Sequence, residues 1–255
     1  MKLETVIFEK SGKLGRVWFN RPDLLNAVNN QATLDWNTVA EAIAADPDLR
    51  VVVITGTGDR SFSTGIDLKQ LSAGQIEQIY HHRWERALRI LETCDKIIIA
   101  AINGWCLGGG LQLALACDIR VARADAQLGL PAIKECLIPG LSVFRLPRYV
   151  GLGRAKRLIL SGDNIGASEA QAIGLVDYVF ERDEFAAKVD ELTAHYLEAA
   201  SMGGRQAKIL TTHAFDYDHA TMIEKYFSAQ IIATDHPDHA EAGRAYREGR
   251  DPVWG

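Results

Sequence analysis

The sequence has few of the features on which small disulfide- or metal-stabilised domains and membrane proteins depend. Its 255 residues include only 4 cysteines and 7 prolines, and no stretch of about 18 apolar residues that would cross a bilayer. No two cysteines form a CxxC pair and no histidine lies at zinc-finger spacing from them, which argues against a metal site or a disulfide framework. We therefore predict four buried free thiols and no bound metal, in a reducing compartment.

An excess of positive charge is also absent. The chain has 28 basic and 33 acidic residues, a formal net charge of −5, which gives no electrostatic reason to bind nucleic acid or an acidic membrane. Residues 1–5 include an acid and lack the apolar core of a signal peptide. We expect a cytoplasmic protein with no nucleic-acid or membrane partner.

Short apolar runs alternate with helical patterns over the first 180 residues, which predicts an α/β fold. Val51–Thr55 and Ile97–Ile102 are apolar runs rich in β-branched residues, typical of strands buried on both faces. Further strands are predicted at 6–8, 17–19 and 119–122, and helices at 31–45, 73–94 and 111–117. From 143 onward the pattern is mostly helical, interrupted at 176–180. No linker or repeat appears, so we predict one core domain with a helical C-terminus.

Three consecutive glycines, Gly108–Gly110, follow the predicted strand that ends at Ile102 and precede a predicted helix. N–H groups at a helix N-terminus favour negative charge, and glycine lets a ligand approach the backbone closely. Tight strand–helix packing is the alternative, and it explains one glycine better than three. No phosphate-binding GxxxxGK[ST], complete dinucleotide fingerprint, GxSxG or HExxH pattern is present.

A second turn of small residues, Ser61–Leu68, follows the strand at 51–55. Its backbone N–H groups and those at the glycines can converge on one oxygen atom and form an oxyanion hole. The alternative is an ordinary loop in which Asp67 caps the next helix.

Together with these two turns, further segments along most of the chain match a known family pattern in the same order. They include Asn20-Arg21-Pro22, Phe62–Leu68, Ala101–Gly104 with Leu107–Gly110, Cys117–Arg120, Ile138-Pro139-Gly140, Arg145–Arg148 and Ala170–Asp177. With them the sequence resembles the crotonase superfamily, the enoyl-CoA hydratase/isomerase family. The resemblance implies an α/β crotonase-like spiral of ββα units over 1–195, and a helical trimerisation region over 196–255, in a homotrimer or hexamer.

The resemblance also implies a coenzyme A thioester as substrate and no separate cofactor. It places the thioester oxygen on the N–H groups of Ile66 and Gly109. Further substrate-binding positions that it implies are Leu25, Asn26, Ala27, Ser63, Thr64, Gly65, Asp67, Leu68, Gly108 and Ala132.

Two positions depart from the pattern of the family. Hydratases of the family place glutamates where this chain has Gln112 and Ala132. A glutamine amide orients a water molecule but cannot take its proton. We therefore expect an acyl-CoA enzyme that stabilises a thioester enolate without the usual pair of glutamates.

Two nearby groups are candidates for proton transfer. Glu135 lies three residues after Ala132, although a solvated surface glutamate is the alternative. His81 and His82 lie on a predicted helix, where neighbouring side chains point about 100° apart, so only one can face a site. Of the two, His82 is taken as the candidate.

Gln112 together with Lys134-Glu135, Ile138-Pro139-Gly140 and Arg145-Leu146 is similar to another branch, a cofactor-independent dioxygenase that acts on an arylacetyl-CoA and cleaves its thioester. That enzyme has a large additional N-terminal region. An oxidative or hydrolytic aryl- or acyl-CoA enzyme, and a non-catalytic acyl-CoA-binding relative, are the two alternative functions.

Overall fold

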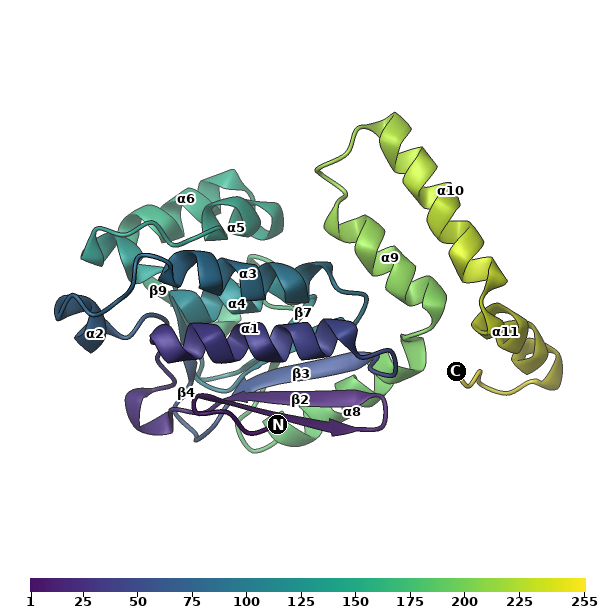
Figure 1. Ribbon diagram of the computed structural model, residues 1–255, viewed down its shortest axis with the longest axis horizontal. Helices are drawn as coiled ribbons and strands as arrows, with labels where there is room; N and C mark the ends of the chain where they lie inside the picture. The colour runs from purple at the N-terminus through teal and green to yellow at the C-terminus, as the bar shows by residue number, and fades with distance from the viewer.

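A six-stranded sheet forms the centre of the computed structural model, which describes residues 1–255 (Figure 1). Its strands lie in the order β1 (Val6–Ser11), β2 (Leu14–Phe19), β3 (Val51–Gly56), β5 (Ile97–Ile102), β7 (Ile119–Arg123) and β10 (Tyr178–Phe180). β1 and β2 are antiparallel, whereas every pair from β2 to β10 is parallel. The predicted α/β class is confirmed.

Helices cover both faces of this sheet because its central strands are apolar on both sides. Val52 and Ile54 of β3 join the main core, which includes side chains of α1 (Asn30–Ala45), α3 (Tyr80–Thr93) and α4 (Gly109–Ala116). The alternate residues Val51 and Val53 pack with Phe185 of α8 (Phe185–Ala199) on the opposite face. The continuous apolar runs therefore mark doubly covered strands, as predicted.

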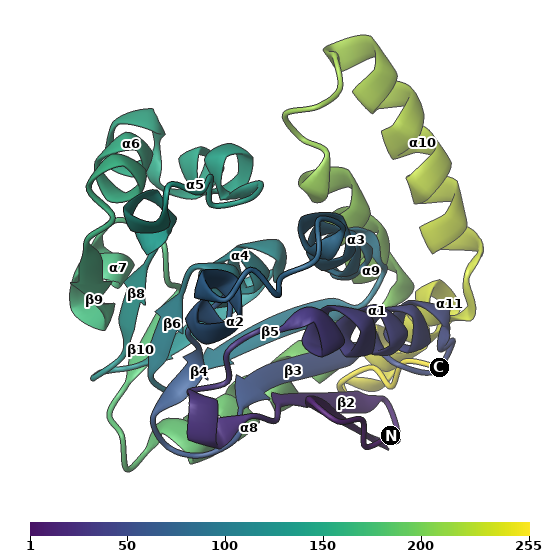
Figure 2. The ribbon, with the colours of Figure 1, turned by 60° about the vertical axis from the view of Figure 1, so that its left-hand side comes forward.

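A smaller sheet positions the loops that matter for function. Its strands are β4 (Ser61–Ser63), β6 (Trp105–Leu107), β8 (Gln127–Gly129) and β9 (Asn164–Gly166), in that order. β4, β6 and β8 are parallel neighbours (Figure 2). Their carboxyl ends therefore lie at one edge of the sheet, followed by residues 64–68, by Gly108 with α4, and by the short 3₁₀ helix η2 (Pro131–Glu135).

The rest of the chain is mainly helical. The remaining elements are η1 (Pro22–Leu24), α2 (Leu68–Ser72), α5 (Ser142–Val150), α6 (Leu152–Ser161), α7 (Ala167–Ala172), α9 (Met202–Thr212), α10 (His219–Asp235) and α11 (Pro237–Glu248). α9 lies against the core, whereas α10 stands away from it in both views (Figures 1 and 2). No helix has the length and apolar character needed to span a membrane.

Two expectations about local structure were wrong. The helix predicted over 73–94 begins only at Tyr80, because Gly74 adopts a φ of +67° and separates it from α2. Cys136 is exposed, unlike the other three cysteines, since it follows η2 in a left-handed conformation on the surface.

Candidate active site

The two turns that were expected to converge do so because they follow neighbouring strands. Ser63 of β4 pairs with Cys106 of β6 in parallel, so both chains leave the sheet at the same edge. Their contact is so close that a Cβ atom on Gly65 would lie 2.5 Å from the amide nitrogen of Gly109. Gly65 also has a φ of +81°, which side chains other than glycine rarely adopt.

The N–H group of Ile66 is left without a protein acceptor by the way its segment pairs. Val28 donates to the carbonyl of Gly65 at 2.7 Å, and Asp67 donates to the carbonyl of Val28 at 2.9 Å. In a parallel bridge of this kind the residue between the two bonds directs its own N–H to the other side. The Ile66 N–H therefore points away from Val28.

The glycine triple places a second backbone donor beside it. Gly109 is the first residue of α4, so its N–H precedes the hydrogen-bond ladder of the helix. Gly108 has a φ of +49°, and a Cβ on Gly110 would lie 2.3 Å from the carbonyl oxygen of Ser63. Both backbone conformation and close packing thus require glycine here, as the packing alternative held.

A cavity of about 480 Å³ opens at this edge. Of the sequence-predicted site residues, it is lined by Leu25, Ala27, Thr64, Ile66, Asp67, Leu68, Gly108, Gly109, Gln112, Ala132 and Glu135. Asn26, Ser63, Gly65 and His82 do not line it.

Asn26 and Ser63 support the cavity from behind. The Asn26 Nδ2 group donates to the carbonyl oxygens of Thr57 at 3.0 Å and Ser61 at 2.9 Å. The Ser63 hydroxyl donates to the Asn26 carbonyl at 2.8 Å. These buried bonds hold the segment that contains Leu25 and Ala27 against the β4 turn.

His81, and not His82, faces the cavity. The rotation of α3 is fixed by Tyr80, Trp84 and Leu88, which are all buried, and this leaves His81 on the cavity side. His82 lines only a neighbouring depression. Burial, and secondly the charge of His82, lower the pKa of His81, which favours its neutral form at pH 7.

Three carboxyl groups line the cavity, and they differ in their partners. Asp67 lies 3.0 Å from the Arg21 guanidinium and accepts a bond from the Gln70 N–H, so it caps α2 as the alternative interpretation held. Asp23 lies in the exposed helix η1. Glu135 stands at the end of η2, half-buried, and its carboxylate has no protein partner.

Sequence reasoning missed four notable lining residues, which are Arg60, Lys69, Tyr80 and Trp84, and it preferred His82 to His81. Arg60 and Lys69 are exposed cations without an ion pair. The Tyr80 hydroxyl donates to the Val28 carbonyl at 3.1 Å, and burial raises its pKa. The position of Arg60 directly before β4 was the available signal for a ligand-facing cation.

Arg60 and Asp23 also line a small depression without apolar residues next to the cavity. At the other end the cavity is bordered by Ala132, Leu137 and Ile138. The site therefore has one polar, cationic end and one more apolar end. No group of three or more His, Cys, Asp or Glu side chains is placed to hold a metal ion.

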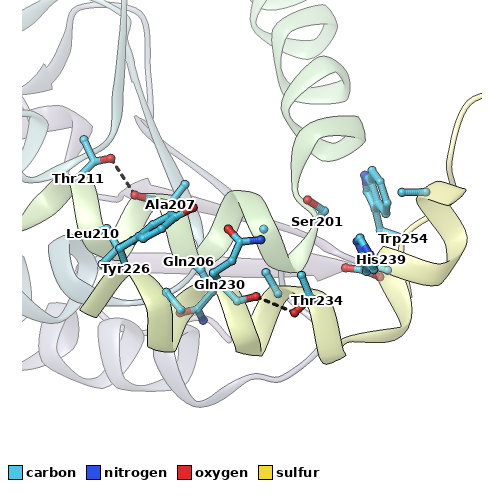
Figure 3. Close-up of a pocket in the computed structure, with 15 residues that line it drawn as sticks. Ser201, Gln206, Ala207, Leu210, Thr211, Tyr226, Gln230, Thr234, His239 and Trp254 are labelled. Carbon is cyan, nitrogen blue, oxygen red and sulfur yellow. Dashed lines mark hydrogen bonds between the residues drawn. The ribbon is translucent and has the colours of Figure 1, made fainter. Parts of the chain in front are cut away.

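A different cavity of about 430 Å³ lies between α9, α10 and α11 (Figure 3). The hydroxyl groups of Thr211 and Thr234 there donate to the carbonyls of Ala207 and Gln230 in their own helices. Asp238 accepts bonds from the N–H groups of Met202 and Gly255. These polar groups already bond to backbone groups of the protein. The cavity at β4 and β6 is therefore the better candidate for a reaction site.

The fold with its cavity at this sheet edge is the crotonase fold, and comparisons with known proteins agree. Residues 9–255 match the family model for enoyl-CoA hydratase/isomerase. A crotonyl-CoA hydratase of Syntrophomonas wolfei is 35% identical over 98% of this chain and 97% of its own. A short-chain-enoyl-CoA hydratase of Clostridium acetobutylicum is 34% identical over 98% and 97%.

A solved structure gives the same result. The crystal structure of an enoyl-CoA hydratase from Bacillus anthracis superposes with a TM-score of 0.91 at 30% identity, covering 98% of this chain and 99% of the other. The chain therefore belongs to the enoyl-CoA hydratase/isomerase family. It is an enzyme of acyl-CoA metabolism.

Proposed function

We propose that this enzyme adds water to a 2-enoyl-CoA by stabilising the thioester enolate on the N–H groups of Ile66 and Gly109. The observation that carries the proposal is the pair of adjacent backbone donors at the cavity, one of them without a protein acceptor. Attack on the β-carbon moves an electron pair toward the thioester oxygen. Two preorganised donors stabilise that charge, each by about 3 kcal/mol.

Glu135 is the group that we propose moves the proton. Its carboxylate takes a proton from water as the oxygen bonds to the β-carbon, and returns it to the α-carbon when the enolate collapses to the thioester. Among the three acids of the cavity it is the one that is half-buried and unpaired. One carboxyl group thus both removes the proton from water and delivers a proton to the α-carbon, so the reaction needs no second acid or base.

Because positions 112 and 132 hold glutamine and alanine, neither position supplies a second carboxylate. The Gln112 amide lines the same cavity and has both a donor and an acceptor to orient the attacking water. Ala132 leaves space beside Glu135. This arrangement supports a hydratase that works with one glutamate.

The cationic end of the cavity is suited to the coenzyme. Arg60 and Lys69 have no carboxylate partner, and such side chains bind phosphate groups. We place the coenzyme A phosphates there, with Leu25 and Ala27 along the carrier and the acyl chain between Leu137 and Gln112. No separate cofactor enters this scheme.

The experiment compares Glu135→Gln with Glu9→Gln in hydration of crotonyl-CoA and longer 2-enoyl-CoAs. Glu9 is an exposed residue of β1. Loss of the proton-transfer group is expected to lower kcat by about 10²–10⁴-fold, while Glu9→Gln keeps the wild-type rate. Equal rates in the two variants would overturn the role of Glu135.

The same oxyanion geometry serves two other reactions, which the assay separates. An oxidative or hydrolytic aryl- or acyl-CoA enzyme releases free coenzyme A thiol or consumes oxygen, and the absence of a carboxyl group at Gln112 and Ala132 favours it as second candidate. Thiol release without hydration would establish that reaction. Binding of acyl-CoA without any turnover would instead identify a non-catalytic relative.

We also propose that residues 196–255 assemble the chain into a homotrimer or hexamer, with residues 1–195 as the catalytic core. α10 exposes five large apolar side chains, Ile223, Tyr226, Phe227, Ile231 and Ile232. A helix that stands away from its own core with such a surface is suited to bury it against a neighbouring copy.

A further inference from the structure

The cavity at the oxyanion donors does not end at Gln112. A second depression of about 380 Å³ lies beyond it, and His81, Trp84 and Gln112 line both spaces. The other residues around the second depression are His82, Glu85, Arg86, Arg89, Gly140 and Leu141. One wall is therefore α3, and the other is the turn that precedes α5.

The side chain of Gln112 forms the boundary between the two spaces, and few interactions fix its position. The Gln112 amide makes no hydrogen bond to another protein group. It lies against Gly140, where a Cβ atom would come within 2.7 Å of the Gln112 Oε1 atom. Gly140 has a φ of +50°, so both its conformation and this contact favour glycine. Because Gly140 has no side chain, the Gln112 amide can lie at this position between the two spaces.

The second depression has one cation without a partner. Arg86 donates to Asn37 at 2.6 Å and pairs with Glu41. Glu85, the acid of this depression, is 3.2 Å from the Arg145 guanidinium nitrogen Nη1. Arg89 makes no ion pair, and it lies one helical turn after Glu85 on the same face of α3. An unpaired guanidinium in a depression next to the cavity is suited to a carboxylate.

We infer that this enzyme takes dicarboxylic acyl-CoA thioesters, whose distal carboxylate binds Arg89 beyond Gln112. The inference rests on the proposed function, because it assumes that the thioester lies at Ile66 and Gly109. Gly109 and Gln112 are separated by about 4.5 Å along the axis of α4. An acyl chain of medium length is longer than this distance, so its end reaches past the Gln112 amide. An uncharged chain end would lie beside Arg89 and His82 and leave both without a partner.

The histidines of the depression supply further polar contacts. The pKa of His81 is lowered by burial, so at pH 7 its neutral ring can donate to or accept from a carboxylate or a water molecule. His82 adjoins the same space and makes no hydrogen bond of its own. The one acid in the depression, Glu85, shares the Arg145 guanidinium with Glu92. The lining itself carries two guanidinium groups, Arg86 and Arg89, against this one carboxylate, which favours an anion.

Calorimetry with saturated thioesters tests the inference without relying on catalysis. The probes are suberyl-CoA and octanoyl-CoA, which differ in their chain end, with adipyl-CoA and hexanoyl-CoA as a shorter pair. The wild type is expected to bind the dicarboxylic member of one pair about five- to tenfold more tightly. Arg89→Gln should bring the ratio of the two dissociation constants close to one. Arg154→Gln, an equal change of charge on the exposed surface of α6, should leave the ratio unchanged.

Each outcome has a distinct meaning. Equal affinity for both members of each pair in the wild type would overturn the inference, as would a preference that survives in Arg89→Gln. Preference for the dicarboxylic thioester without hydration of any 2-enoyl-CoA would contradict the proposed reaction and still support the carboxylate site. Failure of every acyl-CoA to bind would overturn both. The melting temperatures of the two variants check that each one is folded.

Discussion

Gly65 and Gly109 come from separate loops and touch through their backbones, since a Cβ atom on Gly65 would lie 2.5 Å from the Gly109 nitrogen. The contact joins the residue before Ile66 to the first residue of α4. The spacing between the two proposed oxyanion donors therefore depends on the absence of one side chain.

Gly65→Ala is expected to separate these donors and lower kcat/KM by about 10²–10³-fold, the usual cost of losing an oxyanion-hole donor. Gly74→Ala is the matched control. Gly74 also has a positive φ, +67°, but a Cβ atom there has no neighbour within 4 Å. Both variants carry the backbone strain, and Gly65→Ala alone disturbs the contact. Similar turnover in the two variants would contradict the proposed oxyanion hole.

Arg145 is predicted to be a main electrostatic link between α3 and α5. It is 3% exposed, and its guanidinium group bonds Glu92 at 2.8 Å and Glu85 at 3.2 Å. Arg145→Met leaves two partly buried carboxylates without a partner, so the free energy of unfolding should fall by about 3 kcal/mol. Arg157→Met, which breaks the exposed pair with Glu169, should cost about 0–1 kcal/mol. Urea unfolding measures both, and equal losses would refute this role of Arg145.

Glu241 makes the C-terminal segment sensitive to acid. Bonds from Arg250, Arg244 and the Val253 N–H lower the pKa of its carboxyl group to about 2. A carboxyl whose pKa is lower in the folded state contributes stability above its unfolded pKa, near 4.5, and loses that contribution as the pH falls toward 2.

Thermal unfolding from pH 7 to pH 2 tests this dependence. Glu241→Gln should melt below the wild type at neutral pH, and the difference should vanish toward pH 2. Glu224→Gln, at an exposed position of α10, should follow the wild type throughout. A difference between Glu241→Gln and the wild type that stays constant with pH would contradict the linkage.

The exposed apolar side chains of α10 are expected to hold the proposed oligomer together. Phe227 and Ile231 are 59% and 60% exposed in the single chain. Phe227→Glu with Ile231→Glu places two charges in the contact, so light scattering should give the mass of one chain with no change in circular dichroism. Lys225→Glu on the same helix should keep the assembled mass. A wild type that is already monomeric would overturn the proposed assembly.

Much of the candidate site follows from local sequence. The β-branched run of β3, the run of β5, and the glycines before α4 define their elements through neighbours in the chain. The resemblance then orders these elements into one fold. Of the residues expected at the site, 11 line the cavity, including Ile66, Gly109 and Glu135.

The tertiary structure decided which side chains reach the cavity. His81 replaced His82 because the packing of Tyr80 and Trp84 sets the rotation of α3, and no local pattern reports that rotation. Asn26 and Ser63 proved to be supports because their partners, Thr57 and Ser61 among them, come from other loops.

The sequence by itself determined the strand, turn and helix on which each oxyanion residue stands, because those depend on contacts between near neighbours in the chain. Only the tertiary structure decided that β4, β6 and β8 end at one edge, and that Arg89 lies beyond Gln112 without a partner. Distances between distant segments are set by the packing of the whole core, which no short stretch of sequence encodes.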